Sequence, residues 1–330
     1  MTTFQALQTR QTDDGFINEM VTRDLADLGE GGVLVRVQWS SLNFKDALSA
    51  SGNKGVTRQF PHTPGIDAVG VVESADEGPF SVGDRVICTG YDLGMNTDGG
   101  YGDYIRVPAE WLVPLPEGLA PREAMVLGTA GLTAALCVES LLDTGLQPEQ
   151  GEVLVTGASG GVGSVAVAIL ARLGFQVVAV SGKAEAREWL QQLGASRVVD
   201  RETLLEGADK PMTRPLWSGA IDCVGGDMLT AALKSLQYGA SAACCGLAAS
   251  PKLEMTVLPF ILRGINLLGV DSVELPCEIK LQMWQLLADE WKPADMGLLE
   301  AAEVSRAELP DWFARILSGG VRGRVVVKVS

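Results

Sequence analysis

Histidine is almost absent from this sequence. His62, in a Pro-His-Thr-Pro segment, is the single histidine among 330 residues. A Ser-His-Asp hydrolase would need that residue together with a nucleophile elbow, and no such elbow accompanies it. A zinc site would need it together with cysteines at ligand spacing, which are also missing. The sequence therefore argues against both chemistries, and we expect a loop position for His62 and no bound metal.

The cysteines form neither a disulfide framework nor a ligand motif. None has C-x-x-C spacing, and most sit in apolar segments, which is typical of reduced core thiols in a cytosolic protein. The six are Cys88, Cys137, Cys223, Cys244, Cys245 and Cys277. The N-terminus, Met-Thr-Thr-Phe-Gln, also lacks the basic and apolar regions of a signal peptide. We therefore expect a cytoplasmic protein.

Positive charge is scarce as well. The chain has 26 Lys and Arg against 41 Asp and Glu, a net charge of −15. Such a charge repels polyanions, which argues against a nucleic-acid or anionic-membrane partner. Charged residues also interrupt every apolar stretch before it could span a bilayer, so we expect no membrane-spanning segment. We expect a small-molecule substrate instead, and any anionic ligand must be held by local basic groups.

The order of apolar segments predicts two domains. Residues 1–124 carry short β signals broken by glycine and proline, at 33–39, 66–72, 84–88 and 104–107. From residue 125 helical and strand patterns alternate, which predicts βαβ units and a parallel sheet. A helix over about 276–291 and a last strand over 323–329 return the chain to the first domain. We therefore predict an α/β fold, with a Rossmann-type doubly wound sheet domain (125–271) inserted into a mainly β domain (1–124 plus 272–330).

A glycine-rich turn opens the second domain. Four glycines follow the apolar run Val153–Val155, and a small-residue helix and a second strand at 176–180 come next. Against G-x-G-x-x-G, the best register is Ala158-x-Gly160-x-x-Gly163, with alanine in the first position. Glycine permits a tight turn and a close approach to a pyrophosphate, and the helix N-terminus favours its charge. A structural turn without a ligand is the alternative, but the strand-turn-helix context favours dinucleotide binding.

The end of the second strand indicates which dinucleotide. An NAD site usually has an Asp or Glu there, on the ribose hydroxyls. This strand ends Val180-Ser181-Gly182-Lys183, without an acid. A hydroxyl, a backbone N–H and an ammonium would instead bind a 2′-phosphate. Arg197 and Arg201 could reach the same phosphate, although a solvated lysine and two surface arginines are the alternative. The missing acid predicts NADPH.

Several segments across the chain resemble the zinc-free medium-chain dehydrogenase/reductases, and more narrowly the YhdH-type quinone oxidoreductase branch, which includes acrylyl-CoA reductases. They include Ser40-Ser-Leu-Asn-Phe-Lys-Asp-Ala-Leu48, Gly128-Thr-Ala-Gly-Leu-Thr-Ala134, Thr156-Gly-Ala-Ser-Gly-Gly-Val-Gly163 and Val257-Leu-Pro-Phe-Ile-Leu-Arg263. The resemblance implies a GroES-like catalytic domain around the Rossmann domain. Zinc members carry Cys-His near Asn43-Phe44 and Gly-His-Glu near Gly65-Ile66-Asp67, and neither ligand set is present here.

Without a Lewis acid to polarise an alcohol or aldehyde oxygen, the implied chemistry is hydride delivery to a carbon that is already electrophilic. The resemblance implies NADPH-dependent reduction of an activated C=C bond, in acrylyl-CoA or a related short unsaturated acyl-CoA, by a homodimer. Two alternatives stay open. One is an NADPH:quinone oxidoreductase, and the other is an NADPH-binding protein without turnover.

The resemblance also implies site residues. It implies that the pyrophosphate is bound by Ser159, Gly160, Gly161, Val162 and Gly163. It also implies that the 2′-phosphate is bound by Ser181, Gly182, Lys183 and Arg201, with Arg197 as a further candidate. The further residues expected to contact the cofactor are Phe44, Thr129, Thr133, Leu247, Ile261, Ser272 and Arg324. The catalytic candidates are Asn43, Lys45, Asp67 and Tyr91, with Asp46 beside them.

Some of these residues have a plainer interpretation. Lys45 and Asp46 would then only pair with each other, Ile261 would pack a core or a dimer interface, and Arg324 would be a solvated strand-end charge. Phe44 departs from the branch, which usually has tyrosine there. A phenyl ring keeps the stacking surface and loses the hydroxyl, so the proton donor is left to water or to a tyrosine such as Tyr91, Tyr101 or Tyr104.

Overall fold

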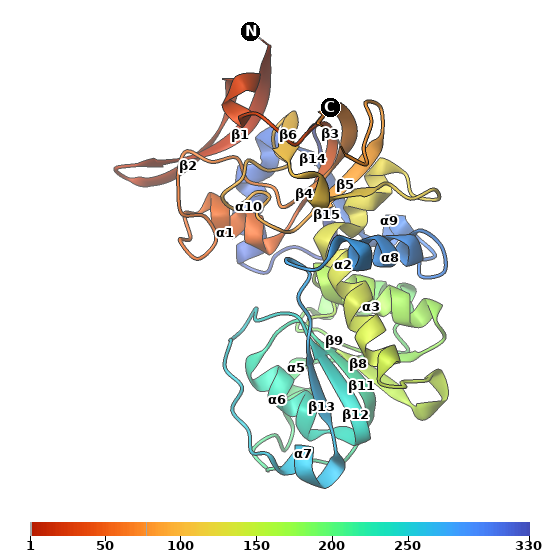
Figure 1. The fold of residues 1–330 in the computed structure, drawn as a ribbon. Coiled ribbons are helices and arrows are strands. Elements are labelled where there is room, and N and C mark those ends of the chain that lie inside the picture. Colours follow the sequence, from red (N-terminus) through yellow and green to blue (C-terminus); the bar gives the residue numbers. More distant parts are fainter. Residues whose placement is uncertain (1, 77) are drawn as a thin grey trace. The chain divides into compact units, whose positions relative to one another are not determined.

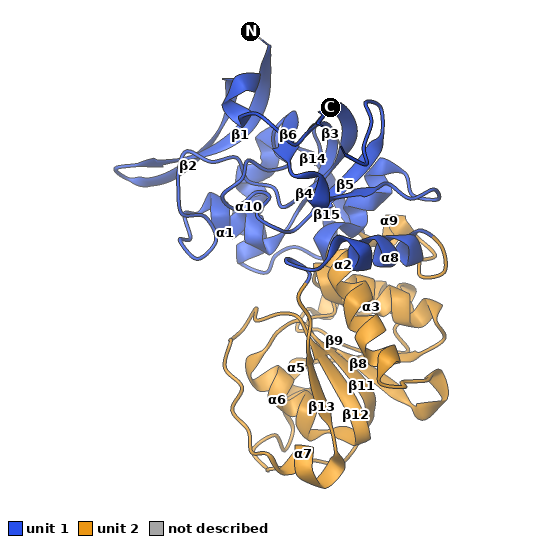
Figure 2. Ribbon diagram, viewed as in Figure 1, with its two compact units in different colours: residues 1–129, 272–288, 300–330 blue, residues 130–271, 289–299 orange. Residues whose placement is uncertain are grey.

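The computed structural model describes residues 2–76 and 78–330, and the chain in it divides into two units (Figure 1, Figure 2). Unit 1 holds the chain up to Thr129 together with Ser272–Ala288 and Glu300–Ser330, and unit 2 holds Ala130–Asp271 and Asp289–Leu299. The predicted division differs at 125–129 and at 289–299. The second segment goes with unit 2 because that unit hydrogen bonds to it: Trp189 Nε1 donates to the Leu298 carbonyl at 2.6 Å.

Unit 1 is built on a seven-stranded sheet, in the order β14-β15-β3-β4-β5-β7, with β6 also pairing with β3. Its pairs are antiparallel except β14 with β15. Alternate residues of β3, among them Val33, Val35 and Val37, enter one buried core. The strands are β3 Val33–Leu42, β4 Asp67–Ala75, β5 Arg85–Thr89, β6 Tyr104–Val107, β7 Leu112–Pro114, β14 Glu300–Ser305 and β15 Arg324–Lys328. The last strand thus lies in the first unit, as predicted.

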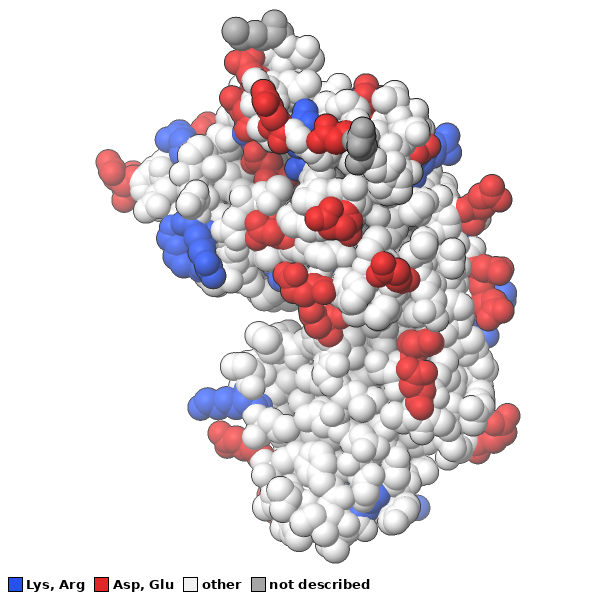
Figure 3. Space-filling view, viewed as in Figure 1, with Lys and Arg blue, Asp and Glu red and all other residues white. Residues whose placement is uncertain are grey.

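Other elements of unit 1 surround this sheet. A separate two-stranded hairpin joins β1 (Thr3–Thr12) to β2 (Gly15–Asp24). The helices are α1 Phe44–Ala50, α8 Cys277–Ala288 and α10 Leu309–Leu317, together with the start of α2, Pro121–Asp143. Acidic side chains are spread over the face seen in Figure 3, where basic ones are sparse, in keeping with the net charge of −15.

Unit 2 is a parallel six-stranded sheet, in the order β10-β9-β8-β11-β12-β13. Its strands are β8 Glu152–Val155, β9 Gln176–Val180, β10 Arg197–Val199, β11 Trp217–Asp222, β12 Leu236–Cys244 and β13 Asn266–Gly269. Its helices are α3 Gly161–Arg172, α4 Arg187–Gln192, α5 Arg201–Leu205, α6 Gly226–Lys234, α7 Leu258–Arg263 and α9 Met296–Leu299. The order reverses between β8 and β11, so this is the predicted doubly wound Rossmann sheet, with its ligand crevice expected at their carboxyl ends.

Helix α2 corrects one expectation. By length and composition it is apolar enough to cross a membrane, so charges do not interrupt every long apolar stretch. Most of its apolar window, 78%, is buried inside the protein, as in a core helix. The helix is also broken at Gly128, whose φ of 52° and ψ of −154° are not helical. This break places Thr129 at the start of a new helical segment.

Candidate functional site

The glycine turn after β8 has the geometry of a phosphate cradle. Gly157 has a φ of +61°, and its carbonyl accepts a hydrogen bond from Gly160 N at 2.9 Å. A Cβ on Gly163 would lie 2.4 Å from the Gly157 oxygen, so α3 can pack this close only with glycine there. The first turn glycine is therefore Gly157, one residue before the alanine of the predicted register. Gly160 precedes α3, whose first N–H groups have no acceptor within the helix.

Four residues predicted at the 2′-phosphate lie together beyond this turn. Ser181 follows β9, and its Oγ donates to Ser159 Oγ at 3.1 Å and accepts from Lys183 N at 3.1 Å. Arg201, the first residue of α5, lies against Gly182. A Cβ on that glycine would be 2.9 Å from Arg201 Nε. A hydroxyl, a guanidinium and the Lys183 segment thus meet at the carboxyl end of β9, next to the glycine turn.

Arg197 lies elsewhere. Its guanidinium makes two hydrogen bonds to the Glu152 carboxylate, at 2.7 and 2.8 Å, and lies over the Trp217 ring. Glu152 is the first residue of β8, so this pair sits where the strand begins rather than where it ends. The Arg197 guanidinium lowers the pKa of Glu152, as expected of a close ion pair. The structure therefore does not bring Arg197 to the Ser181–Lys183 segment.

The other predicted residues of unit 2 lie apart from this group. Leu247 follows β12 and is 65% exposed, and Ile261 on α7 is 71% exposed, so Ile261 does not pack a core. Thr133 is buried in α2. Asp222, at the end of β11, accepts hydrogen bonds from Thr156 Oγ1 at 2.6 Å and from Gly225 N at 2.7 Å. Asp222 therefore joins the loops at the carboxyl ends of β8 and β11.

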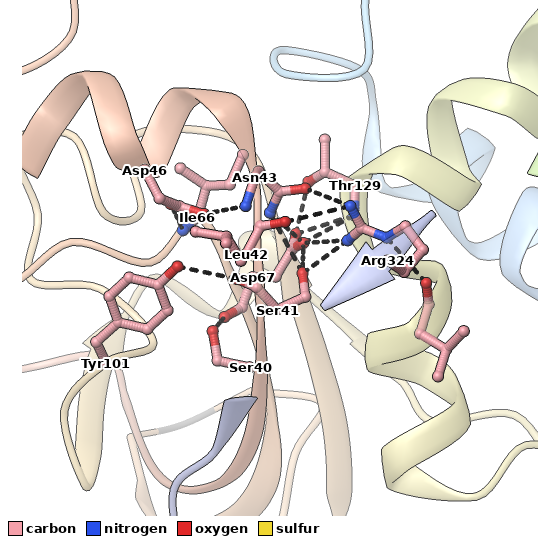
Figure 4. A network of polar contacts seen from close by, with 11 residues as sticks. Ser40, Ser41, Leu42, Asn43, Asp46, Ile66, Asp67, Tyr101, Thr129 and Arg324 are labelled. Atoms are coloured by element: carbon pink, nitrogen blue, oxygen red, sulfur yellow. Dashed lines mark hydrogen bonds and ion pairs between the residues drawn. The ribbon is translucent and has the colours of Figure 1, made fainter. Parts of the chain in front are cut away.

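In unit 1 a buried polar network surrounds Asp67 (Figure 4), and we call it the Asp67 cluster. The Asp67 carboxylate accepts hydrogen bonds from Asn43 Nδ2 at 2.8 Å and Thr129 Oγ1 at 2.6 Å, and also from the Thr129 amide and the Ser41 hydroxyl. Arg324 closes the cluster. It lies 3.9 Å from that carboxylate and donates to Asn43 Oδ1 at 3.2 Å. Its members are Ser41, Asn43, Asp67, Thr129 and Arg324.

The break in α2 makes room for this cluster. A Cβ on Gly128 would lie 2.4 Å from Asp67 Oδ2 and 2.8 Å from Ser41 Oγ. Positive φ and lack of space both require glycine at this position. Arg324 is only 3% exposed, so the alternative of a solvated strand-end charge is wrong. Ser41 and Gly128 both lie in segments that resemble the family. Nothing in the local sequence indicates that these two residues come close to each other in the fold.

Asp46 lies beside the Asp67 cluster. Its carboxylate accepts from Asn43 N at 2.7 Å and Ile66 N at 2.8 Å, which caps α1, so it does not simply pair with Lys45. Burial, together with the nearby Asp67 charge, raises the pKa of Asp46 to about 7. The buried Tyr101 hydroxyl donates to the Ser41 carbonyl at 3.1 Å, and burial raises its pKa well above the usual value. Tyr101 is thus held inside the unit.

The remaining candidate residues of unit 1 differ in exposure and in the interactions that their side chains make. Phe44, the first residue of α1, is 45% exposed. Lys45 beside it is half-buried, and its ammonium has no ion pair among residues 2–76 and 78–330. Tyr91 is committed elsewhere, since its hydroxyl donates to the Leu275 carbonyl at 2.9 Å and Lys280 lies over its ring. Burial raises the pKa of Tyr91 to about 12, which makes it a weak acid.

Two further outcomes concern histidine and cysteine. His62 lies outside the helices and longer strands but is buried, and it pairs with Thr9 in an isolated bridge. Cys88 and Cys137 are buried, whereas the other four cysteines are only partly so; all six are free thiols. In the part of the chain that the structure describes, no group of three or more His, Cys, Asp and Glu side chains is placed to hold a metal ion.

Two family descriptions match this chain. Residues 29–117 match the alcohol dehydrogenase GroES-like domain, and residues 161–289 match the zinc-binding dehydrogenase family. The probable acrylyl-CoA reductase AcuI of Escherichia coli K12 is 46% identical over 326 residues, which cover 99% of this chain and 100% of that protein. The chain belongs to the medium-chain dehydrogenase/reductase superfamily, in its YhdH/AcuI branch. Members of this superfamily are oxidoreductases, and so is this chain.

Solved structures of this branch agree closely with the fold. The YhdH protein of E. coli K-12, solved with bound NADPH, superposes with a TM-score of 0.95 at 45% identity, covering 99% of this chain and all of that one. The protein YhfP of Bacillus subtilis is named a putative quinone oxidoreductase and is 44% identical over 99% of both chains. Its structure, with NAD bound, has a TM-score of 0.97 and covers 99% of this chain and 100% of that one.

Proposed function

We propose that this chain is an NADPH-dependent reductase of activated C=C bonds, and that it converts acrylyl-CoA, or a related short α,β-unsaturated acyl-CoA, to the saturated thioester. The observation that carries the cofactor choice is the group formed by Ser181, Gly182, Lys183 and Arg201 at the end of β9. Hydroxyl, amide and guanidinium donors suit a 2′-phosphate, and the segment holds no acid that would repel it.

The residues of unit 2 fit the rest of this cofactor. In the turn from Gly157 to Gly163, a Cβ on Gly163 would lie 2.4 Å from the Gly157 oxygen, so glycine keeps the turn close to α3, whose N-terminus suits a pyrophosphate charge. Ser159, Gly160, Gly161, Val162 and Gly163 would hold the pyrophosphate. Bound NADPH supplies the hydride for the β-carbon of the substrate. Phe44, Thr129, Thr133, Leu247, Ile261, Ser272 and Arg324 stay predicted contacts for its remaining parts.

The choice of substrate follows from what the reaction requires. Hydride addition at the β-carbon leaves an enolate oxygen that needs hydrogen-bond donors, and a proton must then reach the α-carbon. Phe44 offers neither. Since the hydroxyl of Tyr91 is engaged and its pKa is raised, we assign the proton to water and the donors to backbone amides or a ribose hydroxyl. An unsaturated thioester is electrophilic enough to react without a metal, and the name of the E. coli relative, an acrylyl-CoA reductase, supports this substrate.

The Asp67 cluster has a positioning role in this proposal. Asn43 is held on one side by the Asp67 carboxylate and on the other by Arg324, and it directly precedes Phe44 and Lys45 at the start of α1. The cluster would thereby fix where α1 begins. Asn43, Lys45, Asp67 and Tyr91 stay predicted site residues, and the engaged hydroxyl of Tyr91 makes it the least suited to donate a proton.

The test is NADPH oxidation by the purified protein with acrylyl-CoA, with a simple quinone, or with neither. Oxidation with acrylyl-CoA supports the proposal, and it should persist after extended chelation. Oxidation with the quinone alone would favour an NADPH:quinone oxidoreductase, an alternative that the name of YhfP supports. Protection by NADPH against heating, with turnover of neither substrate, would favour a non-catalytic NADPH-binding protein.

A cytoplasmic homodimer completes the proposal. Strand β13 is the last strand of the unit 2 sheet, and the segment before it exposes the apolar side chains of Val257, which precedes α7, and of Ile261 and Leu262 on α7. An unpaired sheet edge with exposed apolar residues suits pairing with a second copy. Light scattering of Ile261→Asp beside the wild-type chain tests it: we expect a dimer that the aspartate weakens.

A further inference from the structure

Three thiols meet in unit 2 at a place that the proposed reaction does not use. Cys223 follows β11 and Cys245 follows β12, and their sulfur atoms are 3.9 Å apart. Cys137, on α2, lies close enough to the Cys245 sulfur for the two thiols to shift each other's pKa. The chain had shown no cysteine motif, because the three residues come from separate elements.

The backbone at Cys223 and Cys245 suits a disulfide. Asp222 of β11 is in register with Cys244 of β12, so the next residues of the two segments also face each other. Neighbouring strands lie about 4.8 Å apart, within the range of about 4.4–6.8 Å that a disulfide needs between its Cα atoms. Both cysteines are partly exposed, whereas Cys137 is buried. A small oxidant therefore has better access to the Cys223–Cys245 pair.

The three thiols are not equally reactive. The interactions among the three thiols lower the pKa of Cys245 and raise the pKa of Cys137 and the pKa of Cys223. A thiolate is the nucleophile in thiol oxidation, so Cys245 is the attacking sulfur and its neighbour is the resolving one.

We propose that Cys223 and Cys245 form a reversible redox pair that is oxidised by hydroperoxides. The Cys245 thiolate attacks the peroxide oxygen, the O–O bond breaks, and a sulfenic acid forms while the leaving alkoxide or hydroxide takes a proton. The Cys223 sulfur then attacks the sulfenic sulfur, its proton goes to the departing hydroxyl, and water leaves. Two thiols and one hydroperoxide thus give one disulfide, one alcohol or water, and one further water. Thiol–disulfide exchange with a dithiol reverses the change.

The disulfide should disturb the loop after β12. The sulfurs must approach from 3.9 Å to the bonded distance of about 2.05 Å. Gly246 already lies so close to Cys223 that a Cβ on it would be 2.3 Å from the Cys223 oxygen. Movement of Cys245 is therefore passed on to Gly246 and Leu247. Leu247 is a predicted cofactor contact, so this consequence, unlike the disulfide itself, rests on the proposed function.

Peptide mapping under non-reducing conditions tests the pair directly. After treatment with stoichiometric hydrogen peroxide, we expect a Cys223–Cys245 linkage that dithiothreitol removes. Cys244→Ser is the matched control, because Cys244 is adjacent in sequence but packs into the core of unit 2, and it should leave the linkage unchanged. A Cys137–Cys245 linkage, or no disulfide at all in protein that is folded by circular dichroism, would overturn the proposal.

Activity gives a second, separate measurement. With acrylyl-CoA and NADPH, oxidation should lower the rate on the order of ten- to a hundredfold, the scale expected of a displacement of about 1 Å. Cys223→Ser and Cys245→Ser should each retain their rate after the same treatment. If the protein is inactive before oxidation but still forms the Cys223–Cys245 disulfide, the result contradicts the proposed function and supports the redox pair. Full activity of the linked wild-type protein would overturn the proposed effect on the loop.

Discussion

Arg201 lies so close to Gly182 that a Cβ at position 182 would come within 2.9 Å of the Arg201 Nε atom. This contact joins the start of α5 to the end of β9. The Arg201 guanidinium therefore lies at the segment that contacts the adenosine ribose in nucleotide-binding sheets of this type. The cofactor preference that we propose depends on this arrangement.

Removal of the two cations should therefore change the cofactor preference. In the double variant Lys183→Ala, Arg201→Ala, we expect NADPH to bind more weakly while NADH is little affected. Each lost charge-assisted contact is worth on the order of 1.5–3 kcal/mol, or roughly ten- to a hundredfold in affinity. Titration of both cofactors by fluorescence measures the ratio. Arg197→Ala is the matched control and should leave the ratio unchanged, because Arg197 is bound to Glu152. An unchanged ratio in the double variant would refute the assignment.

Phe44 allows a test of the proton donor. Phe44→Tyr restores the hydroxyl usual in the branch, and we expect only a modest change in kcat, because water already supplies the proton. Phe44→Ala should lower kcat more, because the phenyl ring that we expect to pack against the cofactor is lost. Steady-state kinetics with acrylyl-CoA compare the three proteins. A rise of about a hundredfold or more in Phe44→Tyr, near the scale of a working general acid, would instead favour a degraded enzyme and the non-catalytic alternative.

The Asp67 cluster should matter for stability. Asp67→Ala leaves the buried Arg324 without its carboxylate, and loss of one partner of a buried pair costs about 3–5 kcal/mol. Guanidinium denaturation measures the free energy of unfolding. The exposed pair of Arg36 and Glu73 is the control, since Glu73→Ala should cost less than about 1 kcal/mol. Equal costs at the two sites would show that the cluster does not hold unit 1 together.

Asp46 predicts a pH dependence of stability. Burial raises its folded-state pKa from the ordinary value of 3.8 to about 7, so the folded protein keeps a proton that the unfolded chain releases. The stability from this proton is complete below about pH 4 and is lost as the pH rises through about 7. We therefore expect the difference in unfolding free energy between wild type and Asp46→Asn to shift against the wild type as the pH rises from about 5 to about 8. Parallel curves for both proteins would contradict the protonated state.

The parts of the fold that were predictable have local signals. The turn between Gly157 and Gly163 follows an apolar strand and precedes a small-residue helix, and all three pieces are contiguous. The apolar run in the strand over 323–329 predicts a place inside the sheet of the first domain, and β15 does pair with β3. The sequence does not indicate the hairpin of β1 and β2, because much of the hairpin is exposed and its sequence is largely polar.

The features that the sequence does not predict depend on tertiary contacts, which have no local sequence signal. Arg197 and Arg201 are separated by three residues, yet one begins a strand and the other a helix, so their side chains reach different places. Asp67 and Arg324 meet only because β15 returns to the sheet beside β3. The break at Gly128 falls inside an apolar segment without a local signal for it, and it lies where Asp67 comes so close that a Cβ at 128 would be 2.4 Å from Asp67 Oδ2.

The most direct test of the central claim follows the hydride itself. The wild-type protein is given acrylyl-CoA with NADPH that carries deuterium at both C4 positions, and the product is analysed by mass spectrometry and NMR. We predict propionyl-CoA with one deuterium, located on the β-carbon, and a solvent proton on the α-carbon. Oxidation of the cofactor without deuterated propionyl-CoA, or with deuterium on the α-carbon, would contradict the account.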